Sequence, residues 1–104
     1  MKTQLKKGVL EMCVLSLISK RDHYAYEIVQ TLEQTIEISE GTIYPLMRRL
    51  QTEKYVSTYL VESLSGPSRK YYKIEEKGIV ELEVMKIEWR NFYLDVNHLL
   101  GWED

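Results

Sequence analysis

One stretch of the chain, from Ser39 to Leu50, combines polar side chains with the period of a helix. Four apolar residues keep the i, i+3, i+4, i+7 spacing of one helix face: Ile43, Leu46, Met47 and Leu50. The side chains outside this stripe carry hydroxyl, phenol or guanidinium groups: Thr42, Tyr44, Arg48 and Arg49. Such groups hydrogen-bond to phosphate oxygens and base edges, so this face suits a groove of DNA. An ordinary amphipathic surface helix has the same pattern, and the neighbouring elements must decide between the two interpretations.

The start of this helix has two interpretations. Ser39 is a favourable N-cap residue whose hydroxyl can accept a hydrogen bond from an amide of the first turn. A helix that starts at Glu40 places Pro45 beyond the first turn, where proline distorts a helix. With Thr42 as the cap, Pro45 lies in the first turn, where its missing N–H is harmless. The sequence leaves both starts open.

The residue types that catalyse reactions or hold metals are few and scattered. The five glycines form no phosphate-binding loop, and His23 and His98 lie far apart in the chain. The single cysteine, Cys13, sits in an apolar run where a buried structural thiol is expected. We therefore predict no enzyme, no cofactor and no metal site.

Charge is distributed unevenly along the chain. Its 104 residues suit one domain, and 44% apolar with 29% charged residues is typical of globular proteins. The net charge is −2, but residues 1–73 hold eleven basic and eight acidic side chains, and residues 74–104 hold three and eight. A mildly basic body permits DNA binding, with Lys6 and Lys7 either touching phosphates or lying solvated at a helix end. No apolar stretch is long enough for a membrane, so we expect a cytoplasmic protein.

Two further helices are expected before the Ser39–Leu50 stretch. The first covers residues 4–19 and is apolar enough to be buried on more than one side. The second covers about residues 24–34, and its apolar contacts come from Tyr26, Ile28, Val29 and Leu32. A short connector over residues 35–38 leads into the third helix, at about 40–53. Two helices joined by a short turn indicate a helix-turn-helix.

A β-hairpin is expected directly after the helix-turn-helix. Residues 55–64 and 69–74 are rich in tyrosine, valine and threonine, and the turn-forming cluster Ser65-Gly66-Pro67-Ser68 separates them. A hairpin in this position is the wing of a winged helix. Its tip carries small, polar and cationic residues suited to phosphates or a minor groove: Gly66, Ser68, Arg69 and Lys70. A solvated hairpin tip would have a similar composition.

The last element is a long helix from Glu75 to about Leu100. Its apolar residues repeat at the a and d positions of a heptad: Leu82, Met85, Trp89, Phe92, Val96 and Leu99. A helix of this length spans roughly 38 Å at 1.5 Å per residue, more than a small winged body can cover. We therefore predict that residues 75–104 form a dimerisation helix on a winged helix-turn-helix domain at 1–74, giving a homodimer. The alternative is that the stripe folds back on its own domain.

Three motifs resemble the PadR-like family of transcriptional regulators. Residues 41–50, Gly-Thr-Ile-Tyr-Pro-Leu-Met-Arg-Arg-Leu, look like the signature of that family. Residues 24–28 resemble its second-helix motif, and residues 69–72 followed by Lys77-Gly78 resemble its second wing strand and the entry to its last helix. The single helix after the wing resembles the short subfamily that includes multidrug-responsive repressors.

The resemblance implies a mainly α fold with a small β-hairpin, in which a homodimeric repressor reads a palindromic operator in double-stranded DNA. The predicted DNA-facing residues are Lys6, Lys7, Tyr24, Ser39, Gly41, Thr42, Tyr44, Pro45, Arg48, Gly66, Ser68, Arg69 and Lys70. In some relatives the tryptophan matched by Trp89 lines a drug pocket at the dimer centre. The residues predicted to bind a planar hydrophobic effector there are Met85, Trp89, Phe92 and Tyr93, although an aromatic stripe at heptad spacing also suits simple packing.

Three positions depart from the family pattern, and one function from another class remains open. Lys54 stands where glycine is frequent after the third helix, Glu75 where a threonine cap is frequent, and Ala25 where glycine is frequent. A side chain in a left-handed cap costs about 1 kcal/mol, so the turn at Lys54 is expected to differ. The alternative function is a winged-helix protein-interaction module without DNA binding, which the net charge of −2 favours mildly.

Overall fold

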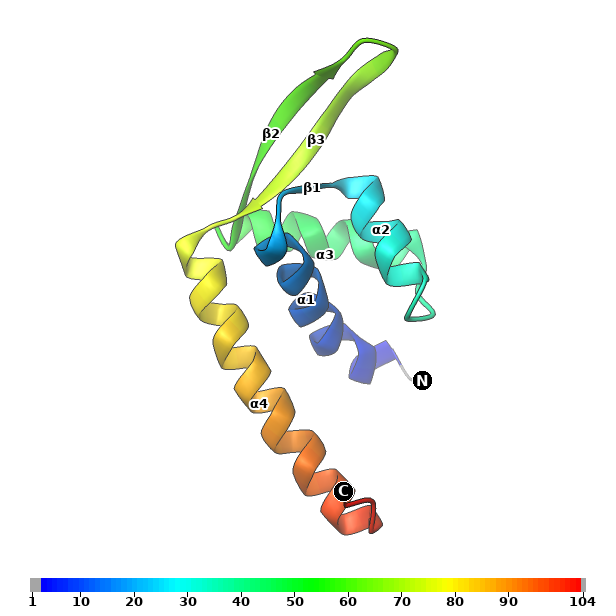
Figure 1. Cartoon of the computed structure of the whole chain (residues 1–104), viewed down its shortest axis with the longest axis vertical. Helices are drawn as coiled ribbons and strands as arrows, with labels where there is room; N and C mark the ends of the chain where they lie inside the picture. The colour runs from blue at the N-terminus through cyan, green and yellow to red at the C-terminus, as the bar shows by residue number, and fades with distance from the viewer. Residues whose placement is uncertain (1–2, 104) are drawn as a thin grey trace.

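The computed structural model describes the backbone of residues 3–103 and the side chains of residues 8–103. Its elements, in chain order, are α1 (Thr3–Lys20), β1 (His23–Tyr24), α2 (Ala25–Glu33), α3 (Glu40–Thr52), β2 (Val56–Ser63), β3 (Gly66–Ile74) and α4 (Glu76–Leu100). The predicted fold class is confirmed, since the chain is mainly helical with a small antiparallel sheet and a long last helix (Figure 1). Among the described residues, no helix is both long and apolar enough to cross a membrane.

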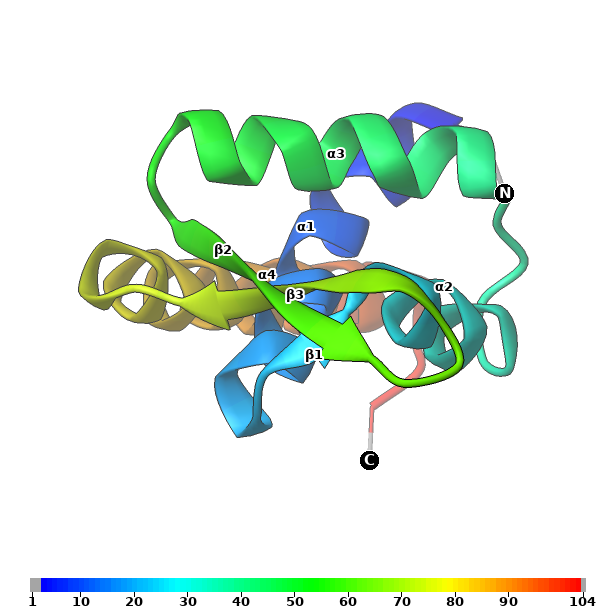
Figure 2. The same ribbon diagram turned by 90° about the horizontal axis from the view of Figure 1, so that it is seen from above.

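The molecule is elongated, with principal extents of 55 × 28 × 22 Å. The β2–β3 hairpin projects from one end and α4 runs toward the other, with α1, α2 and α3 gathered between them (Figure 1). Seen from the hairpin end, α3 lies along one side of the hairpin (Figure 2). The wing and the tail of α4 therefore leave the body in opposite directions.

The core lies where the first three helices meet the base of the hairpin. Its buried residues are Leu10, Val14, Leu15 and Ile18 of α1; Ile28, Val29 and Leu32 of α2; Ile43, Leu46, Met47 and Leu50 of α3; Val56, Tyr72 and Leu82. All four stripe residues of α3 are at most 7% exposed, so its predicted apolar face is confirmed. This packing fixes which side of α3 is left for a partner.

A short strand, β1, was not expected from the sequence. The second helix was predicted to begin at about Tyr24, but His23 pairs with Tyr72 and Tyr24 with Tyr71, which gives a sheet of order β1-β3-β2. Two residues are too few to show a period of two, and only the approach of β3 gives their amides a ladder partner. The helix consequently starts at Ala25.

The hairpin turn is shorter than predicted. Ser63 pairs directly with Gly66, so Leu64 and Ser65 alone form the connection, and residues 66–68 belong to β3. The pairing register shifts by one between Val61 and Ser63, where one residue of β2 lies opposite two residues of β3, so the extra residue of this bulge belongs to β3. Turn-forming residues led to the wrong boundary because glycine and proline are also tolerated at the start of a strand and at a bulge.

The start of α3 is the first of the two predicted alternatives. The amides of Thr42 and Ile43 both donate to the carbonyl of Ser39, at 3.0 and 3.3 Å, so Pro45 lies inside the helix. The sequence suggested that the hydroxyl of Ser39 would cap an amide. It instead forms a hydrogen bond of 3.2 Å with the hydroxyl of Thr42. Because Pro45 has no N–H, the carbonyl of Gly41 does not receive the helix hydrogen bond that residue 45 would otherwise donate.

The turn that ends α3 keeps the left-handed conformation despite its lysine. Lys54 has φ 65°, its amide donates to Gln51, and the amide of Tyr55 donates to the carbonyl of Leu50 at 3.0 Å. These two bonds form a Schellman motif, which satisfies the last carbonyls of the helix. The expectation that this turn would differ is therefore wrong, and Lys54 adopts the conformation that glycine takes more easily.

The first turn of α4 is locked onto this corner. The carbonyl of Tyr55 accepts the amide of Glu75 at 3.0 Å, and the ammonium of Lys77 donates to the carbonyl of Glu53 at 2.9 Å. A Cβ at Gly78 would overlap the Tyr55 carbonyl oxygen and lie 2.9 Å from Cγ1 of Ile74. This close backbone approach explains why glycine is needed here, and it fixes the direction in which α4 leaves the body.

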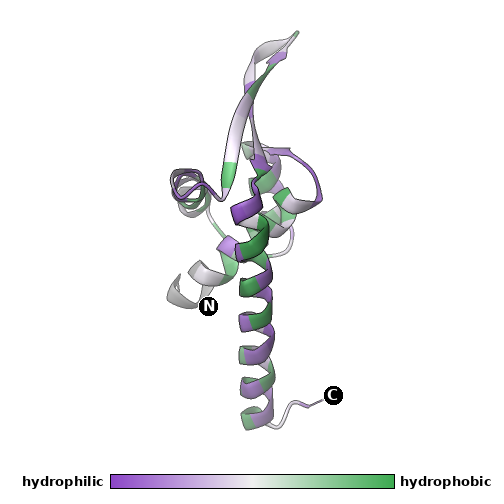
Figure 3. Ribbon diagram, turned by 90° about the vertical axis from the view of Figure 1, so that its left-hand side faces the viewer, coloured by the Kyte–Doolittle hydropathy of each residue, from purple (hydrophilic) through white to green (hydrophobic). Residues whose placement is uncertain are grey.

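The apolar stripe of α4 is covered only near its start. Leu82 is 2% exposed and belongs to the core of its own body, which corrects its assignment to a dimer seam. Met85 packs against the same core, whereas Trp89, Phe92 and Leu99 are 37%, 53% and 85% exposed. Apolar residues continue along the helix to its end (Figure 3). The alternative of a fold-back therefore holds for the start of α4, as far as Met85, and not for its outer part.

Candidate nucleic-acid interface

The outer face of α3 is flat at its start and cationic toward its end. Gly41, Pro45, Arg48 and Thr52 follow one another along the line opposite the buried stripe, and all four are exposed. Glycine and proline present little side chain, so the backbone itself can approach a flat or grooved partner. Arg48 is the long side chain on this line, with a guanidinium free to reach base edges or phosphates.

A groove of about 430 Å³ joins α3 to the wing and to the first turn of α2. Its lining residues are Tyr24, Ala25, Tyr26, Tyr44, Arg69 and Lys70. Tyr72 lies buried at the base of β3, and burial raises its pKa while the nearby positive charge of Arg48 acts in the opposite direction. The groove thus brings phenol groups of β1, α2 and α3 and cations of β3 to one surface. Tyr24, Tyr44, Arg69 and Lys70 among them are predicted DNA-facing residues.

The wing cations rest on aromatic rings. The guanidinium of Arg69 lies 4.6 Å from the ring centre of Tyr24, and the ammonium of Lys70 lies 5.6 Å from that of Tyr72. These are cation–π distances, at which the rings restrain the cations without neutralising them. Gly66 and Ser68 lie further out on the exposed part of β3 and do not line the groove.

The start of α2 is fixed by an ion pair. Glu27 accepts the amide of Tyr24 at 3.1 Å and the guanidinium of Arg21 at 3.0 Å. The hydrogen bond from Arg21 holds the pKa of the Glu27 carboxyl below its usual range. Glu27 therefore stays ionised and anchors Tyr24, whose ring supports Arg69.

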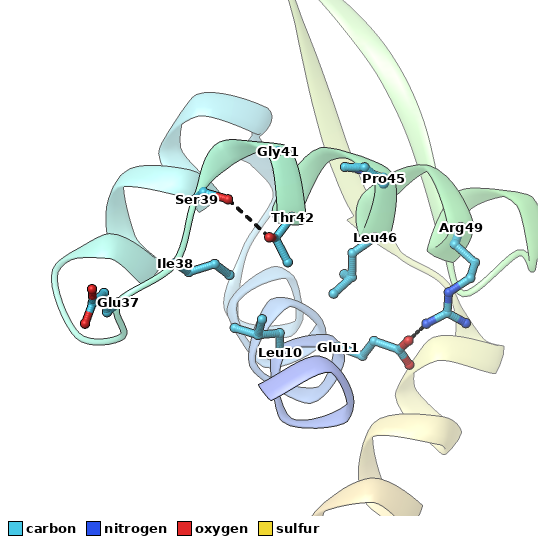
Figure 4. A pocket seen from close by; sticks show the side chains of 10 residues that line it. All are labelled: Leu10, Glu11, Glu37, Ile38, Ser39, Gly41, Thr42, Pro45, Leu46 and Arg49. Atoms are coloured by element: carbon cyan, nitrogen blue, oxygen red, sulfur yellow. Dashed lines mark hydrogen bonds and ion pairs between the residues drawn. The ribbon is translucent and has the colours of Figure 1, made fainter. Parts of the chain in front are cut away.

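The opposite edge of α3 faces α1 rather than the wing. Ser39, Gly41, Thr42 and Pro45 line a pocket of about 720 Å³ together with Leu10 and Glu11 of α1 and others (Figure 4). Arg49 lies on this edge, where it forms an ion pair with Glu11 and a second with Glu53 at 3.6 Å. The residues predicted to face DNA on α3 therefore divide between two edges, with Tyr44 on the wing side and Thr42 on the α1 side.

One groove residue was assigned differently from the sequence. Tyr26 was expected among the apolar contacts of its helix, but it is 51% exposed and lines the groove. Its position in the first turn of α2, close to Tyr24, could have indicated this exposure, but the spacing of apolar residues along the helix did not. The side chains of Lys6 and Lys7 lie outside the described residues.

A second cluster of functional interest lies on α4. The ring of Trp89 lies 6.3 Å from Phe92 and 5.9 Å from Tyr93, centre to centre. Trp89 and Met12 line two hollows between α1 and α4, of about 360 and 250 Å³. The larger hollow also contains Cys13, and burial raises the pKa of its thiol, as expected for an unreactive cysteine. Phe92 and Tyr93 thus lie beside Trp89, and Met85, the fourth predicted effector residue, lines the smaller hollow.

The described residues contain no cluster of His, Cys, Asp and Glu that could hold a metal ion. The groove and the α4 cluster are instead built from aromatic, apolar and cationic groups. Such groups bind by stacking and charge.

The chain is similar to transcription factors over most of its length. Residues 14–84 match the family described as the transcriptional regulator PadR-like family. A PadR-like transcriptional regulator from Bacillus cereus has 44% identity and a TM-score of 0.85, covering 97% of this chain and 100% of that chain. A PadR-like transcription factor from Bacteroides fragilis has 40% identity and a TM-score of 0.79, covering 93% and 95%. An uncharacterised protein from Lysinibacillus sphaericus is 30% identical over 92 residues, which are 85% of this chain and 84% of that protein.

Proposed function

The chain belongs to the PadR-like family of transcriptional regulators, which bind DNA and are not enzymes, and from this membership we propose that it is a homodimeric repressor of a palindromic operator. The groove between α3, α2 and the wing supports this proposal most directly, since it presents Arg69 and Lys70 beside the exposed Arg48 of α3. The family membership counts against the alternative of an interaction module without DNA binding.

In this proposal α3 enters a major groove with its flat outer line. Gly41 and Pro45 allow the helix backbone to lie close to the bases, and Arg48 reads base edges or holds a phosphate. Tyr44 and the two wing cations contact the neighbouring phosphates, which set the position of the protein on the duplex. These contacts to phosphates weaken steeply as the salt concentration rises.

Dimerisation is proposed to bury the outer part of α4. Trp89, Phe92, Leu99 and Leu100 lie on one face of this helix and are between 37% and 85% exposed. A run of large apolar side chains on a monomer surface marks an interaction site. A two-fold symmetric dimer has the same patch on both chains and presents two copies of α3, which is why the operator should be palindromic.

We further propose that a planar hydrophobic molecule binds near Trp89 and releases the repressor. The ring contacts of Trp89 with Phe92 and Tyr93, and the apolar hollow beside Met12, support this site. A ligand that separates the two α4 helices would change the spacing of the two α3 helices, because Gly78 couples α4 tightly to the body.

The DNA proposal is tested by selecting bound duplexes from a random pool and titrating the selected site by fluorescence anisotropy. Arg48→Ala should lower the affinity about tenfold or more, since a good contact to a base contributes about 1–3 kcal/mol. Arg90→Ala, at an exposed arginine of α4, is the matched control and should bind as the wild type does. Sedimentation should give the same oligomeric state for both variants. Unchanged affinity of Arg48→Ala would remove this residue from the interface.

The effector proposal is tested with planar cationic dyes in a Trp102→Phe background, where Trp89 is the single tryptophan. Binding should quench its fluorescence and lower the affinity for the selected duplex. Absence of quenching by any dye, with DNA binding intact, would contradict the effector site and leave the DNA proposal standing.

A further inference from the structure

Three tyrosines form a continuous row across the outer face of the sheet. Tyr24 of β1 and Tyr59 of β2 both pair with Tyr71 of β3, so the three side chains lie on the same face. The ring of Tyr71 lies 5.6 Å from each neighbour, stacked at 15° on Tyr59 and tilted at 59° to Tyr24. Both distances are within the range of favourable aromatic pairs. The row therefore connects all three strands by side chains.

Both ends of the row are anchored. The phenol of Tyr59 donates a hydrogen bond of 2.5 Å to Oδ2 of Asp22, in the segment that precedes β1. The hydrogen bond to this carboxylate raises the pKa of Tyr59. At the other end, the guanidinium of Arg69 lies over Tyr24. The tyrosine row thus links Asp22 of the body, the β2–β3 hairpin and the guanidinium of Arg69.

The backbone alone holds the hairpin to the body only weakly. β1 contributes two residues to the sheet, and the outer part of the hairpin consists of exposed residues. A two-stranded ribbon that projects from a body twists and bends easily unless side chains fix its base. Val56 and Tyr72 already bury the base of the hairpin in the core, and the tyrosine row adds a second connection on the other face, because it joins β2 and β3 to β1 and to Asp22.

The row also determines where the guanidinium of Arg69 lies. Along β3, Arg69 and Lys70 point to opposite faces of the sheet, yet both line the groove beside α3. Stacking over Tyr24 holds Arg69 at the rim of this groove. A guanidinium that stacks through its flat face keeps the N–H groups at its edge free, and these are the groups that bind a phosphate through two hydrogen bonds.

We propose that Asp22, Tyr59 and Tyr71 are positioning residues for DNA binding, which fix the wing and hold Arg69 ready for a backbone phosphate. The proposal rests on the DNA-binding function above and adds residues that do not themselves touch DNA. It follows that an ordered Arg69 should already exist in the free protein. Loss of the row should then weaken DNA binding through Arg69 and not through α3.

The first experiment measures the free protein. The ¹⁵N heteronuclear NOE of the Arg69 Nε–Hε group should show a restrained side chain in the wild type and a mobile one in Tyr71→Val. Tyr71→Phe keeps the ring and should retain the restraint. Tyr59→Phe removes only the hydrogen bond to Asp22 and should give an intermediate value. An Arg69 as mobile in the wild type as the exposed Arg90 would overturn the proposal.

The second experiment is a double-mutant cycle on the selected duplex. Arg69→Gln and Tyr71→Val should each lower the affinity about threefold to tenfold, the range expected for one phosphate contact and the ordering of one long side chain. The double variant should bind no more weakly than Arg69→Gln alone, because both changes remove the same contact. Multiplied losses, with Arg48-dependent binding intact, would overturn only the positioning role. Absence of DNA binding by the wild type would instead overturn the proposed function as well.

Discussion

Two helices of this protein, α3 and α4, carry equally regular apolar stripes, but their surroundings differ. The four stripe residues of α3 are at most 7% exposed, because α1, α2 and the base of the hairpin enclose them. On α4, Leu82 is 2% exposed, whereas Phe92 and Leu99 further along are 53% and 85% exposed. An apolar stripe therefore predicts that a helix face is buried, but it does not predict whether the same chain or another one buries it.

The same contrast explains where the two helices stand in function. A helix held on all of its inner face presents a fixed outer face, which suits recognition of a rigid duplex. A helix that leaves its body beyond Met85 keeps a large apolar surface for another chain or a small molecule. The proposed division of work between DNA contact by α3 and assembly through α4 follows from how much of each helix the body covers.

The largest predicted effect breaks the covered side of this comparison. Leu50→Ala should destabilise the protein by about 2–5 kcal/mol, because it leaves a cavity at a fully buried site of α3. Leu60→Ala is the matched control, since Leu60 is 71% exposed on the wing, and it should change stability by less than about 0.5 kcal/mol. Chemical unfolding of both variants measures the difference. Equal effects would show that the two environments are not distinct.

The second prediction concerns the corner where the two regions join. Gly78→Ala should cost about 1–3 kcal/mol, because its Cβ would meet the carbonyl of Tyr55 and force α4 away from the body. Gly8→Ala, where a Cβ has no atom within 4 Å, should instead leave stability unchanged or raise it. Thermal unfolding compares the two. A Gly78→Ala variant as stable as the wild type would mean that this approach is relaxed in solution.

The third prediction tests the uncovered side of α4. Phe92→Ala should weaken the proposed dimer by about 1–3 kcal/mol, and the resulting loss of stability should grow as the protein is diluted. Sedimentation equilibrium over a range of concentrations measures the dimer, and circular dichroism follows the fold. Leu64→Ala, at the exposed hairpin turn, is the control. An effect of Phe92→Ala that does not depend on concentration would place this ring in its own body.

The smallest predicted effect is a gain at the end of α3. Lys54→Gly should stabilise the protein by up to about 1 kcal/mol, because glycine adopts a φ of 65° without steric cost. Lys54→Ala removes the same long side chain and keeps the strain, so it separates the two causes. The midpoints of denaturant unfolding should rank the glycine variant above the alanine variant. The reverse order would show that the left-handed conformation of residue 54 carries no strain that glycine relieves.

Much of the fold could be predicted because local periods carry it. The helix spacing of Ile43, Leu46 and Met47 predicted the inner face of α3, and the residues around Gly66 predicted a hairpin, although not its two-residue turn. The heptad spacing along α4 predicted its length within a residue of the observed Glu76–Leu100. Each of these features depends on neighbours in sequence, whose side-chain directions follow from backbone geometry alone.

The candidate site was predicted in part, and for a different reason. Tyr44, Arg48, Arg69 and Lys70 were singled out from their types and from the family resemblance, and the structure brings three of them to one groove with Arg48 beside it. The exposure of Tyr26 was not predicted, because its spacing suits an apolar stripe. The pairing of β3 with β1 brings the groove next to Tyr26. The contact between Asp22 and Tyr59 was equally invisible, since thirty-seven positions separate the two residues.

The sequence by itself determined which faces are apolar, where the helices begin and end to within a few residues, and which residue types are offered to a partner. Tertiary structure decided which faces stay uncovered, which strand completes the sheet, and how the wing tyrosines meet. The reason is that periodicity arises from bonds along the chain, whereas burial and ring contacts arise from segments that meet only after folding. Leu82 shows this most clearly, since its heptad position was evident in the sequence and its burial in its own body was not.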